Sequence, residues 1–387
     1  MKKDNKAIQE DLIKRNVGIK IRELRKGENM NAIDLASKAG ISQGQLSKIE
    51  NGKANVSIKN LARLCRILDR PLSYLFQSEE KTFGAHHFIT AVAGLENQGL
   101  HWLAQQIYHQ TNGTVALHPL GTLQFGSAVD QINLIFNGGV DLYIEDLSLF
   151  YMVAPALKLL SLPYNFRDEP HRQAFFSTPY FRENVTDVLL KKGIQLLNPN
   201  WNWIRGLDWV IVSNRPICHP KDVKGLKVRI FDCEHLRVFW EEMGAVPVPV
   251  PWPKVRDAVD SGRVEVLPTL KALVYHNGFC GRAKYVTLLG GLPPVMGVFI
   301  TEKKYASFSP ETKSVLRRAC DNAGNIFSVN LYNTEQKNEK LNLSRHKAVY
   351  LKVDLSPWHL MVSKIRKKMA NEGILLKQTL AQIENAC

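Results

Sequence analysis

The stretch from Asn31 to Gly52 constrains the fold of this chain more than any other. Its sequence, NAIDLASKAGISQGQLSKIENG, predicts two short helices joined by a tight turn. Asn31 and Ser42 are residues that cap helices by accepting hydrogen bonds from free backbone N–H groups. Gly40 falls where a chain leaving a helix commonly needs a positive φ. We expect the apolar positions of the pair to face inward, namely Leu35, Ala36, Ala39, Leu46 and Ile49.

The second predicted helix leaves a polar face outside, formed by Gln43, Gln45 and Lys48. Side-chain amides can read base edges in the major groove, and a lysine can contact phosphate. Solvation of an ordinary surface is the better explanation for any one of these residues taken singly. Taken together on one helix pair, they favour DNA binding.

Composition agrees with a chain of several parts. At 387 residues, of which 45% are hydrophobic, the chain is long enough for two or more domains with sizeable cores. The formal net charge is +15, and residues 1–80 hold 16 Lys and Arg against 10 Asp and Glu. Positive charge favours polyanionic partners through counterion release, although many basic proteins do not bind them.

Several features favour a cytoplasmic protein that does not enter a membrane. The initial lysines are followed by no apolar segment of the kind found in signal peptides. The longest apolar run, Leu288–Ile300, is interrupted by two glycines and two prolines. Six cysteines without CxxC spacing indicate reduced thiols. His276 and Cys280 lack a second ligand pair, so we expect neither a metal nor another cofactor.

Three further helices complete a predicted all-α domain over residues 1–76. One covers residues 7–26, one begins after Ser57, and a short one begins at Pro71. The segment LRKGENMNAIDLASKAGISQGQLSKIENGK, followed by NLARLCRILDRPLSYLF, resembles the Xre family of Cro/repressor-type helix-turn-helix domains. The resemblance covers Val17–Phe76 and implies that a homodimer binds a double-stranded DNA operator.

The resemblance also assigns roles to residues. It implies that the helix Ser42–Glu50 enters the major groove and that Arg25 pairs with Glu50. The family often has Gln where this chain has Ala32, so a phosphate contact is missing or is made by Asn31 or Lys53. The DNA-binding candidates are Asn31, Ser42, Gln43, Gly44, Gln45, Lys48 and Lys53.

After a polar linker over residues 77–84, the pattern changes to alternating helices and strands. We expect helices over residues 95–110 and 128–136, and strands over 114–118, 140–144, 209–212 and 227–231. A long helix is expected from Pro310 into the 330s. This alternation predicts an α/β architecture over residues 85–387.

The second part also resembles a known family, the solute-binding proteins of TRAP transporters. The resemblance rests on TNGTVALHPLGTLQFGSAVDQINLIFNGGVDLYI, on LLSLPYNFRDEPHRQAFF and on the segment from VSNRPICHPKDVKGLKVRIF to DSGRVE. It covers Phe88 to about Ile374. It implies two α/β lobes, joined by crossing strands and a long helix, that close over a ligand. The fold class expected is therefore multidomain, with an all-α helix-turn-helix part and a two-lobed α/β part.

The same resemblance implies that Arg229 holds a ligand carboxylate. The family's second cleft arginine falls near Trp209, with Arg205 close by in sequence, and Thr269 stands at the place of a cleft asparagine. Because these neighbours differ, the ligand's identity cannot be transferred. The carboxylate of a small organic acid remains the expected partner of Arg229.

Four other residues are candidates for the same cleft. Trp201 and Trp203 share a face if their segment is extended, and could stack on a ligand or pack in the core. Core packing is the expectation for Trp209. Glu145 and Asp146 follow a predicted strand, and we prefer helix capping or ligand binding to acid–base catalysis. No nucleophile, phosphate loop or zinc motif stands out, so we expect no enzyme.

The combination suggests a sensor. A ligand-binding fold joined to a DNA-reading domain predicts a ligand-responsive transcriptional regulator. One alternative is a repressor whose second part is a ligand-free dimerisation scaffold, favoured by the changes at Trp209 and Thr269 and opposed by Arg229. An enzyme tethered to DNA is the least favoured alternative.

Overall fold

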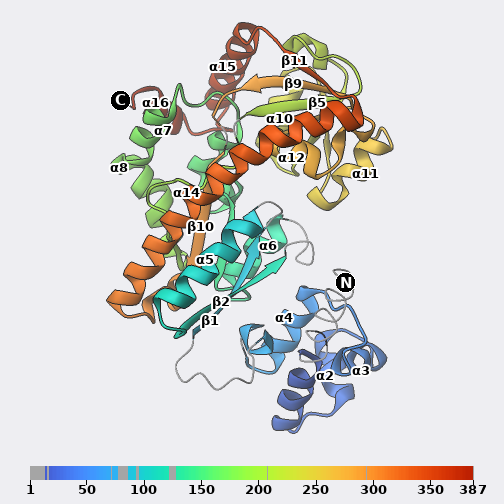
Figure 1. The fold of residues 1–387 in the computed structure, drawn as a ribbon, viewed down its shortest axis with the longest axis vertical. Helices are drawn as coiled ribbons and strands as arrows, with labels where there is room; N and C mark the ends of the chain where they lie inside the picture. The colour runs from blue at the N-terminus through green and yellow to red at the C-terminus, as the bar shows by residue number, and fades with distance from the viewer. Residues whose placement is uncertain are drawn as a thin grey trace. The chain divides into compact units, whose positions relative to one another are not determined.

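The computed structural model describes residue 14 and residues 17–70, 72–76, 86–92, 96–121, 128–206, 208–292 and 294–386. The chain divides into two compact units. Unit 1 contains Met1–Gly94 and Ala104–Tyr143, and unit 2 contains Leu95–Leu103 and Ile144–Cys387. Figure 1 shows the elements coloured along the chain.

Unit 1 begins with the expected helices. Residues 17–27 are helical, followed by α2 (Ala32–Ala39), α3 (Gln43–Glu50), α4 (Ile58–Ile67) and the 3-10 helix η1 (Leu72–Phe76). The sequence patterns predicted both the caps and the turn. Asn31, Ser42 and Ser57 each accept a backbone N–H bond at a helix start, and Gly40 has φ 64°. The last predicted helix is a 3-10 helix.

The helices of this region enclose a small apolar core. Ile21, Leu35, Leu46 and Leu64 are completely buried in it. Gly18 allows the first helix to approach the end of α3, since a Cβ at this position would lie 2.3 Å from the carbonyl oxygen of Ile49.

Unit 1 also contains a parallel strand pair, β1 (His86–Val92) and β2 (Val115–Gly121), together with α6 (Ala128–Phe136). The boundary between the units falls within α5 (Glu96–Gln110) and β3 (Leu142–Asp146). The predicted strand over residues 140–144 begins two residues later than expected, at Leu142, after a turn that contains Gly138 at φ 67°. Residues 7–13 of the predicted first helix and the linker 77–84 lie outside the described residues.

Unit 2 contains most of the remaining elements. Its strands are β4 (Ile194–Leu196), β5 (Trp209–Ser213), β6 (Lys227–Ile230), β7 (Val246–Pro249), β8 (Val266–Leu270), β9 (Tyr285–Gly290), β10 (Met296–Thr301) and β11 (Val349–Lys352). Its longer helices are α7 (Glu169–Phe176), α10 (Glu234–Glu242), α14 (Pro310–Leu341), α15 (Ser356–Asn371) and α16 (Lys377–Glu384). Shorter ones include η3 (Leu147–Met152), η4 (Pro155–Ser161), α9 (Asp187–Lys191), α11 (Val255–Asp260), α12 (Lys271–His276) and α13 (Glu302–Ala306).

Within unit 2, six strands form a sheet with the order β11-β9-β5-β8-β6-β7, and β10 pairs antiparallel with β4. In the six-stranded sheet, β6 runs parallel to β7 and β8, whereas β5 is antiparallel to β8 and β9. One face of this sheet carries a core that includes Val212, Leu267 and Phe279. This arrangement places the carboxyl ends of β6 and β8 at one edge.

Three connections link the parts of unit 2 that contain β9 and β10. Gly290 at the end of β9 and Gly291 after it both have positive φ and lead toward β10. A second crossing segment pairs with this one through the isolated bridge between Ile204 and Val295. The third is α14, a single helix of 32 residues that is visible as the long orange helix in Figure 1. The expected two-lobed architecture with a long helix is confirmed.

Within the described residues, no helix is both long enough and apolar enough to cross a membrane.

We predict that Gly18→Ala destabilises the helical region by about 1–3 kcal/mol, because the added methyl overlaps the backbone of α3. Thermal unfolding of the full chain measures this change. The matched control is Gly27→Ala, where an added Cβ meets nothing within 4 Å. Equal stability of the two variants would contradict the close contact at Gly18.

Candidate functional site

The outer face of α3 is fully available in unit 1. Gln43, Gly44, Gln45 and Lys48 are exposed, as is Lys53 beyond the helix. Gln45 has a second task, since its Oε1 accepts the Ser42 N–H at 3.0 Å while its own N–H donates to Ser42 Oγ. This capping box leaves the amide NH₂ of Gln45 as its free donor.

Arg25 braces α3 from behind. Its Nε and Nη2 donate to the two carboxylate oxygens of Glu50 at 2.7 and 2.9 Å, and its Nη1 donates to the Met30 carbonyl. The bidentate pair expected from the family resemblance is therefore present. Because Glu50 is buried, the pair fixes the end of α3 against the first helix.

Gly44 has no structural reason to be glycine within unit 1. A Cβ added there would meet nothing within 4 Å, and glycine in a helix costs about 1 kcal/mol relative to alanine. Contacts within unit 1 therefore do not require glycine at this position.

Asn31 is engaged in capping. Its Oδ1 accepts the Asp34 N–H at 2.8 Å, which leaves the amide NH₂ as a donor beside the start of α2. Lys53, which follows α3, is exposed.

In unit 2, Arg229 is a buried cation without an acidic partner. It lies on β6 with 4% of its surface exposed, and its Nε donates to the Val250 carbonyl at 3.0 Å. Its Nη2 is buried and has no hydrogen-bond partner. Among the described residues, no carboxylate lies within salt-bridge distance of the guanidinium. Burial lowers the pKa of Arg229 to about 9, so the group still carries its charge at pH 7.

Two aromatic rings flank this guanidinium. Its Cζ lies 3.9 Å from the centroid of Phe231 and 5.5 Å from that of Trp252. These cation–π contacts stabilise the charge only partly, by about 0.5–2 kcal/mol each. The sequence analysis did not identify Phe231 or Trp252. The aromatic residue inside the proline-rich run PVPVPWPK was the signal available for Trp252.

Thr269 belongs to the same face of the sheet as Arg229. Val228 pairs with Val266 in parallel register, so residues 229, 267 and 269 point to one side. Thr269 is buried near the end of β8, and its Oγ1 also has no hydrogen-bond partner.

A cluster of three polar side chains, Cys233, His235 and Ser161, lies at the start of α10. Cys233 precedes α10, and its Sγ lies 3.8 Å from Nε2 of His235. That nitrogen also meets Ser161 Oγ at 3.0 Å, whereas the buried Nδ1 of His235 has no partner.

The serine–histidine contact does not form a catalytic triad. In the part of the chain that the structure describes, no acid orients His235, and the Ser161 hydroxyl donates to the Lys158 carbonyl. Burial lowers the pKa of His235 to about 4 and raises that of the Cys233 thiol to about 11. With these pKa values, His235 and Cys233 are better suited to polar contact with a ligand than to proton transfer or nucleophilic attack.

Glu145 and Asp146 have separate tasks at the end of β3. Glu145 pairs with Arg205, and Arg205 Nη2 lies 2.6 Å from Glu145 Oε1. Arg205 is the arginine close in sequence to Trp209, where the family has its second cleft arginine, and it is already bound to this acid. Asp146 caps η3 by accepting the Ser148 N–H at 2.8 Å, as preferred from the sequence.

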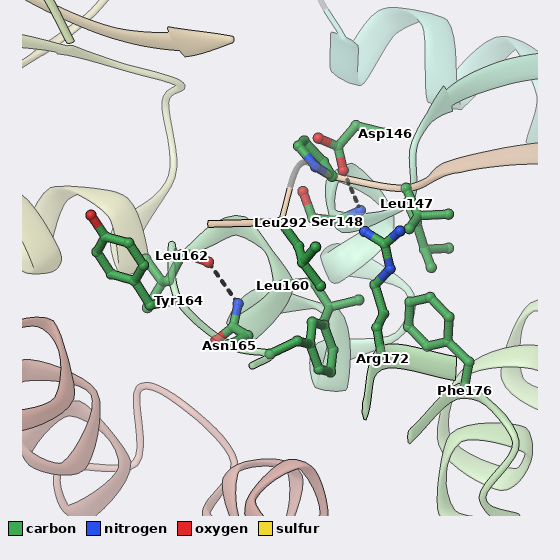
Figure 2. A pocket seen from close by; sticks show the side chains of 13 residues that line it. Asp146, Leu147, Ser148, Leu160, Leu162, Tyr164, Asn165, Arg172, Phe176 and Leu292 are labelled. Atoms are coloured by element: carbon green, nitrogen blue, oxygen red, sulfur yellow. Dashed lines mark hydrogen bonds between the residues drawn. The ribbon is translucent and has the colours of Figure 1, made fainter. Parts of the chain in front are cut away.

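A cavity of about 30 Å³ lies beside this cap. It is lined by Asp146, Ser148 and the buried Arg172, among others. Figure 2 shows the Arg172 side chain extending from α7 toward the Asp146–Ser148 turn. Arg172 itself pairs with Glu169. Arg229 does not line this cavity, which has room for only one or two water molecules.

The tryptophans before β5 are structural. Trp201 has φ 51°, so its segment is not extended and the shared face expected for residues 201 and 203 does not form. The Trp201 ring packs against Phe176 and Phe181. Trp203 is completely buried, and its Nε1 donates to the Cys320 carbonyl at 3.0 Å. Trp209, expected in the core, is half-buried at the start of β5.

No cluster of three His, Cys, Asp or Glu side chains that could hold a metal ion occurs among the described residues.

The fold and these sites together define a protein that joins a helix-turn-helix to a two-lobed solute-binding fold. A family model described as "Helix-turn-helix" matches residues 21–75. A second, described as "Bacterial extracellular solute-binding protein, family 7", matches residues 89–372. This chain belongs to that solute-binding family. The two families indicate DNA binding and small-ligand binding, and neither is a family of enzymes.

Two curated relatives illustrate the ligands bound within this family. The 2,3-diketo-L-gulonate-binding periplasmic protein YiaO of Escherichia coli is 24% identical over 219 residues, which cover 57% of this chain and 66% of that protein. The sialic acid-binding periplasmic protein SiaP of Vibrio cholerae is 24% identical over 245 residues, covering 60% and 72%. The chain thus matches about two thirds of their length.

Solved structures share the fold over most of this chain. A TRAP periplasmic solute-binding protein from a Sulfitobacter species, with bound β-D-galacturonate, has a TM-score of 0.70 at 19% identity over 78% of this chain and 100% of that one. A second, from Chromohalobacter salexigens with bound D-glucuronate, also scores 0.70 at 19% identity and covers 77% and 99%.

We predict that Asp146→Asn stabilises the protein at pH 7 by an amount on the order of 1 kcal/mol. Burial raises the pKa of Asp146 to about 6, above its unfolded value of 3.8, so ionisation disfavours the folded state. Asparagine keeps the oxygen that accepts the Ser148 N–H. The difference in unfolding free energy between the variant and wild type should disappear as the pH falls from 6 to 4, because Asp146 of the folded wild type becomes protonated in this range. Urea unfolding at several pH values measures this, and a constant difference across that range would contradict it.

Proposed function

We propose that this chain is a ligand-responsive, DNA-binding transcriptional regulator that acts in the cytoplasm. In this proposal residues 85–387 bind a small carboxylate-bearing metabolite, and residues 1–76 bind an operator through α3, with residues 77–84 as linker. The observation that carries the proposal is Arg229, a buried guanidinium that has no carboxylate partner among the described residues and whose Nη2 makes no hydrogen bond. A buried charge without a partner is costly, and an anionic ligand would compensate it.

The proposed ligand is a sugar acid or a related hydroxy acid. A guanidinium offers two parallel donors to a carboxylate, and Nη2 of Arg229 is free for one of them. Thr269 Oγ1 and His235 Nδ1 are buried polar atoms that could meet ligand hydroxyls. The relatives' diketogulonate and the neighbours' uronates combine a carboxylate with oxygen substituents, which supports this class. Because Trp209 and Thr269 replace family residues, the particular acid differs or is bound differently.

In the DNA-binding part, we propose that Gln43, Gly44, Gln45 and Lys48 face base edges. Asn31, Ser42 and Lys53 would contact the phosphate backbone, since their donors or charge lie at the start of α2 and around α3. A homodimer would place two such helices in half-sites about 34–36 Å apart. The ligand can change operator affinity only if it binds one conformation of the dimer better than another.

A second candidate has specific support. Arg205 is engaged with Glu145, and Trp209 occupies the family's second arginine position. These features favour a repressor whose second part is a ligand-free dimerisation scaffold. That candidate predicts no effect of any acid on stability or on operator affinity.

We predict that D-glucuronate or D-galacturonate raises the thermal stability of wild type, and that Arg229→Met removes this response. A ligand at a hundred times its Kd should stabilise by about 2.7 kcal/mol. Without ligand, the methionine variant should be at least as stable as wild type, because an uncompensated buried charge has been removed. The control is Arg215→Met, whose side chain is 57% exposed. An equal shift in both variants would exclude Arg229 as the anchor.

We predict that Gly44→Ala stabilises α3 by about 1 kcal/mol yet weakens DNA binding about tenfold or more. The methyl group adds helix propensity but occupies the space that a base edge or phosphate would need. Fluorescence anisotropy with a duplex selected from a random pool measures the affinity. Unchanged affinity would mean that this face of α3 does not lie close to DNA.

A further inference from the structure

A second cavity lies in unit 2 and is separate from the Arg229 site. Its volume is about 470 Å³, within the ordinary range for small-molecule pockets. The walls come from the segment around Tyr164, from Gly291 after β9, and from helices α15 and α16. Neither Arg229 nor any residue of β6 lines it.

The cavity has more positive than negative charge. Arg167 and Arg366 line it together with the single acid Glu384. Within the described residues, neither arginine lies within 4 Å of a carboxylate oxygen. Arg366 Nη1 donates to the Tyr164 carbonyl and to Asn165 Oδ1, both at 2.9 Å, and its buried Nε has no partner. Arg167 makes only one long contact, from Nη2 to the Ala386 carbonyl at 3.4 Å.

One wall is formed by two aromatic rings whose planes are tilted by 36° and by an aliphatic side chain. The rings of Tyr164 and His359 lie 4.0 Å apart at their centroids, and Leu380 lines the same space. Burial and the nearby Arg366 lower the pKa of His359, which favours the neutral ring. The two guanidinium groups supply positive charge beside this wall. This chemistry matches a ligand that combines an oxyanion with a flat or apolar body.

The same wall contacts the connection between β9 and β10. The Tyr164 hydroxyl donates to the Leu289 carbonyl at 2.7 Å. Gly291 has φ 84°, and a Cβ there would lie 3.2 Å from the Tyr164 ring. Tyr164 is itself held at φ 61°, and Arg366 holds its carbonyl. A ligand in this cavity would therefore contact the residues that fix a crossing segment of the fold.

We propose that this cavity is a second ligand site, which takes a small molecule bearing a phosphate or carboxylate on a flat apolar body. Its occupant is bound by Arg167 and Arg366 and packs on Tyr164 and His359. The proposal goes beyond the function proposed above, because it requires neither DNA binding nor a ligand at Arg229.

Isothermal titration of the full chain with phenyl phosphate, and separately with benzoate, tests the site and distinguishes the two anions. At least one of the two anions should bind saturably. Phenyl phosphate should bind more tightly than inorganic phosphate, because its phenyl ring packs on Tyr164 and His359. Arg167→Gln should raise Kd about tenfold, His359→Ala should remove the advantage of the ring, and Glu384→Gln should tighten binding. Arg182→Gln is the control, since this arginine is 66% exposed and does not line the cavity.

The Arg229→Met variant separates this site from the first one. Binding that is unchanged in Arg229→Met and weakened in Arg167→Gln supports the second site. The opposite pattern places these anions at Arg229 and overturns the proposal. Failure of both phenyl phosphate and benzoate to bind wild type also overturns it. Arg167 is exposed, so the unfolding temperature of Arg167→Gln should match that of the control.

Discussion

The second part of this protein depends on one buried positive charge. Arg229 lies inside the six-stranded sheet region with a carbonyl and two aromatic rings around it, and no acid pairs with it among the described residues. Removing an ion from water costs several kcal/mol, which these contacts offset only in part. The chain contains acids that could have been placed there, as Glu145 is placed against Arg205. The fold instead leaves a donor of Arg229 without a partner, and this makes the region suited to an anion from solution.

The two binding regions solve opposite electrostatic problems. At α3 the proposed partner is a polyanion, and the polar groups proposed to contact it are exposed. The charge that must stay fixed, Arg25, is neutralised by Glu50 behind the helix. In unit 2 the charge that matters is the unpaired one. A protein with both features can respond to a small acid and contact a nucleic acid without the two anions competing for one site.

Much of this organisation could be predicted from the sequence, and the reason is local. Caps at Asn31, Ser42 and Ser57 and the turn at Gly40 depend on residues three or four positions apart. The role of Asp146 as a cap has the same origin. The Arg25–Glu50 pair was predicted from resemblance to a known family rather than from spacing, and the carboxylate role of Arg229 is an untested prediction of the same origin. The cleft details could not be predicted, because they depend on contacts between distant segments. His235 meets Ser161 across 74 positions, and Trp201 left the expected face because its φ is positive.

Trp203 connects three segments of unit 2 that are far apart in sequence. A Cβ at Gly99 in α5 would lie 2.9 Å from its ring, and a Cβ at Gly324 in α14 would lie 2.6 Å from it. The indole is thus enclosed between two positions that have no room for a side chain. A larger residue at position 99 or 324 requires a smaller residue at position 203. A smaller residue at position 203 alone leaves a void between the two glycines. In a set of related chains, positions 99, 203 and 324 should therefore vary together, and a chain with alanine at 324 should lack tryptophan at 203.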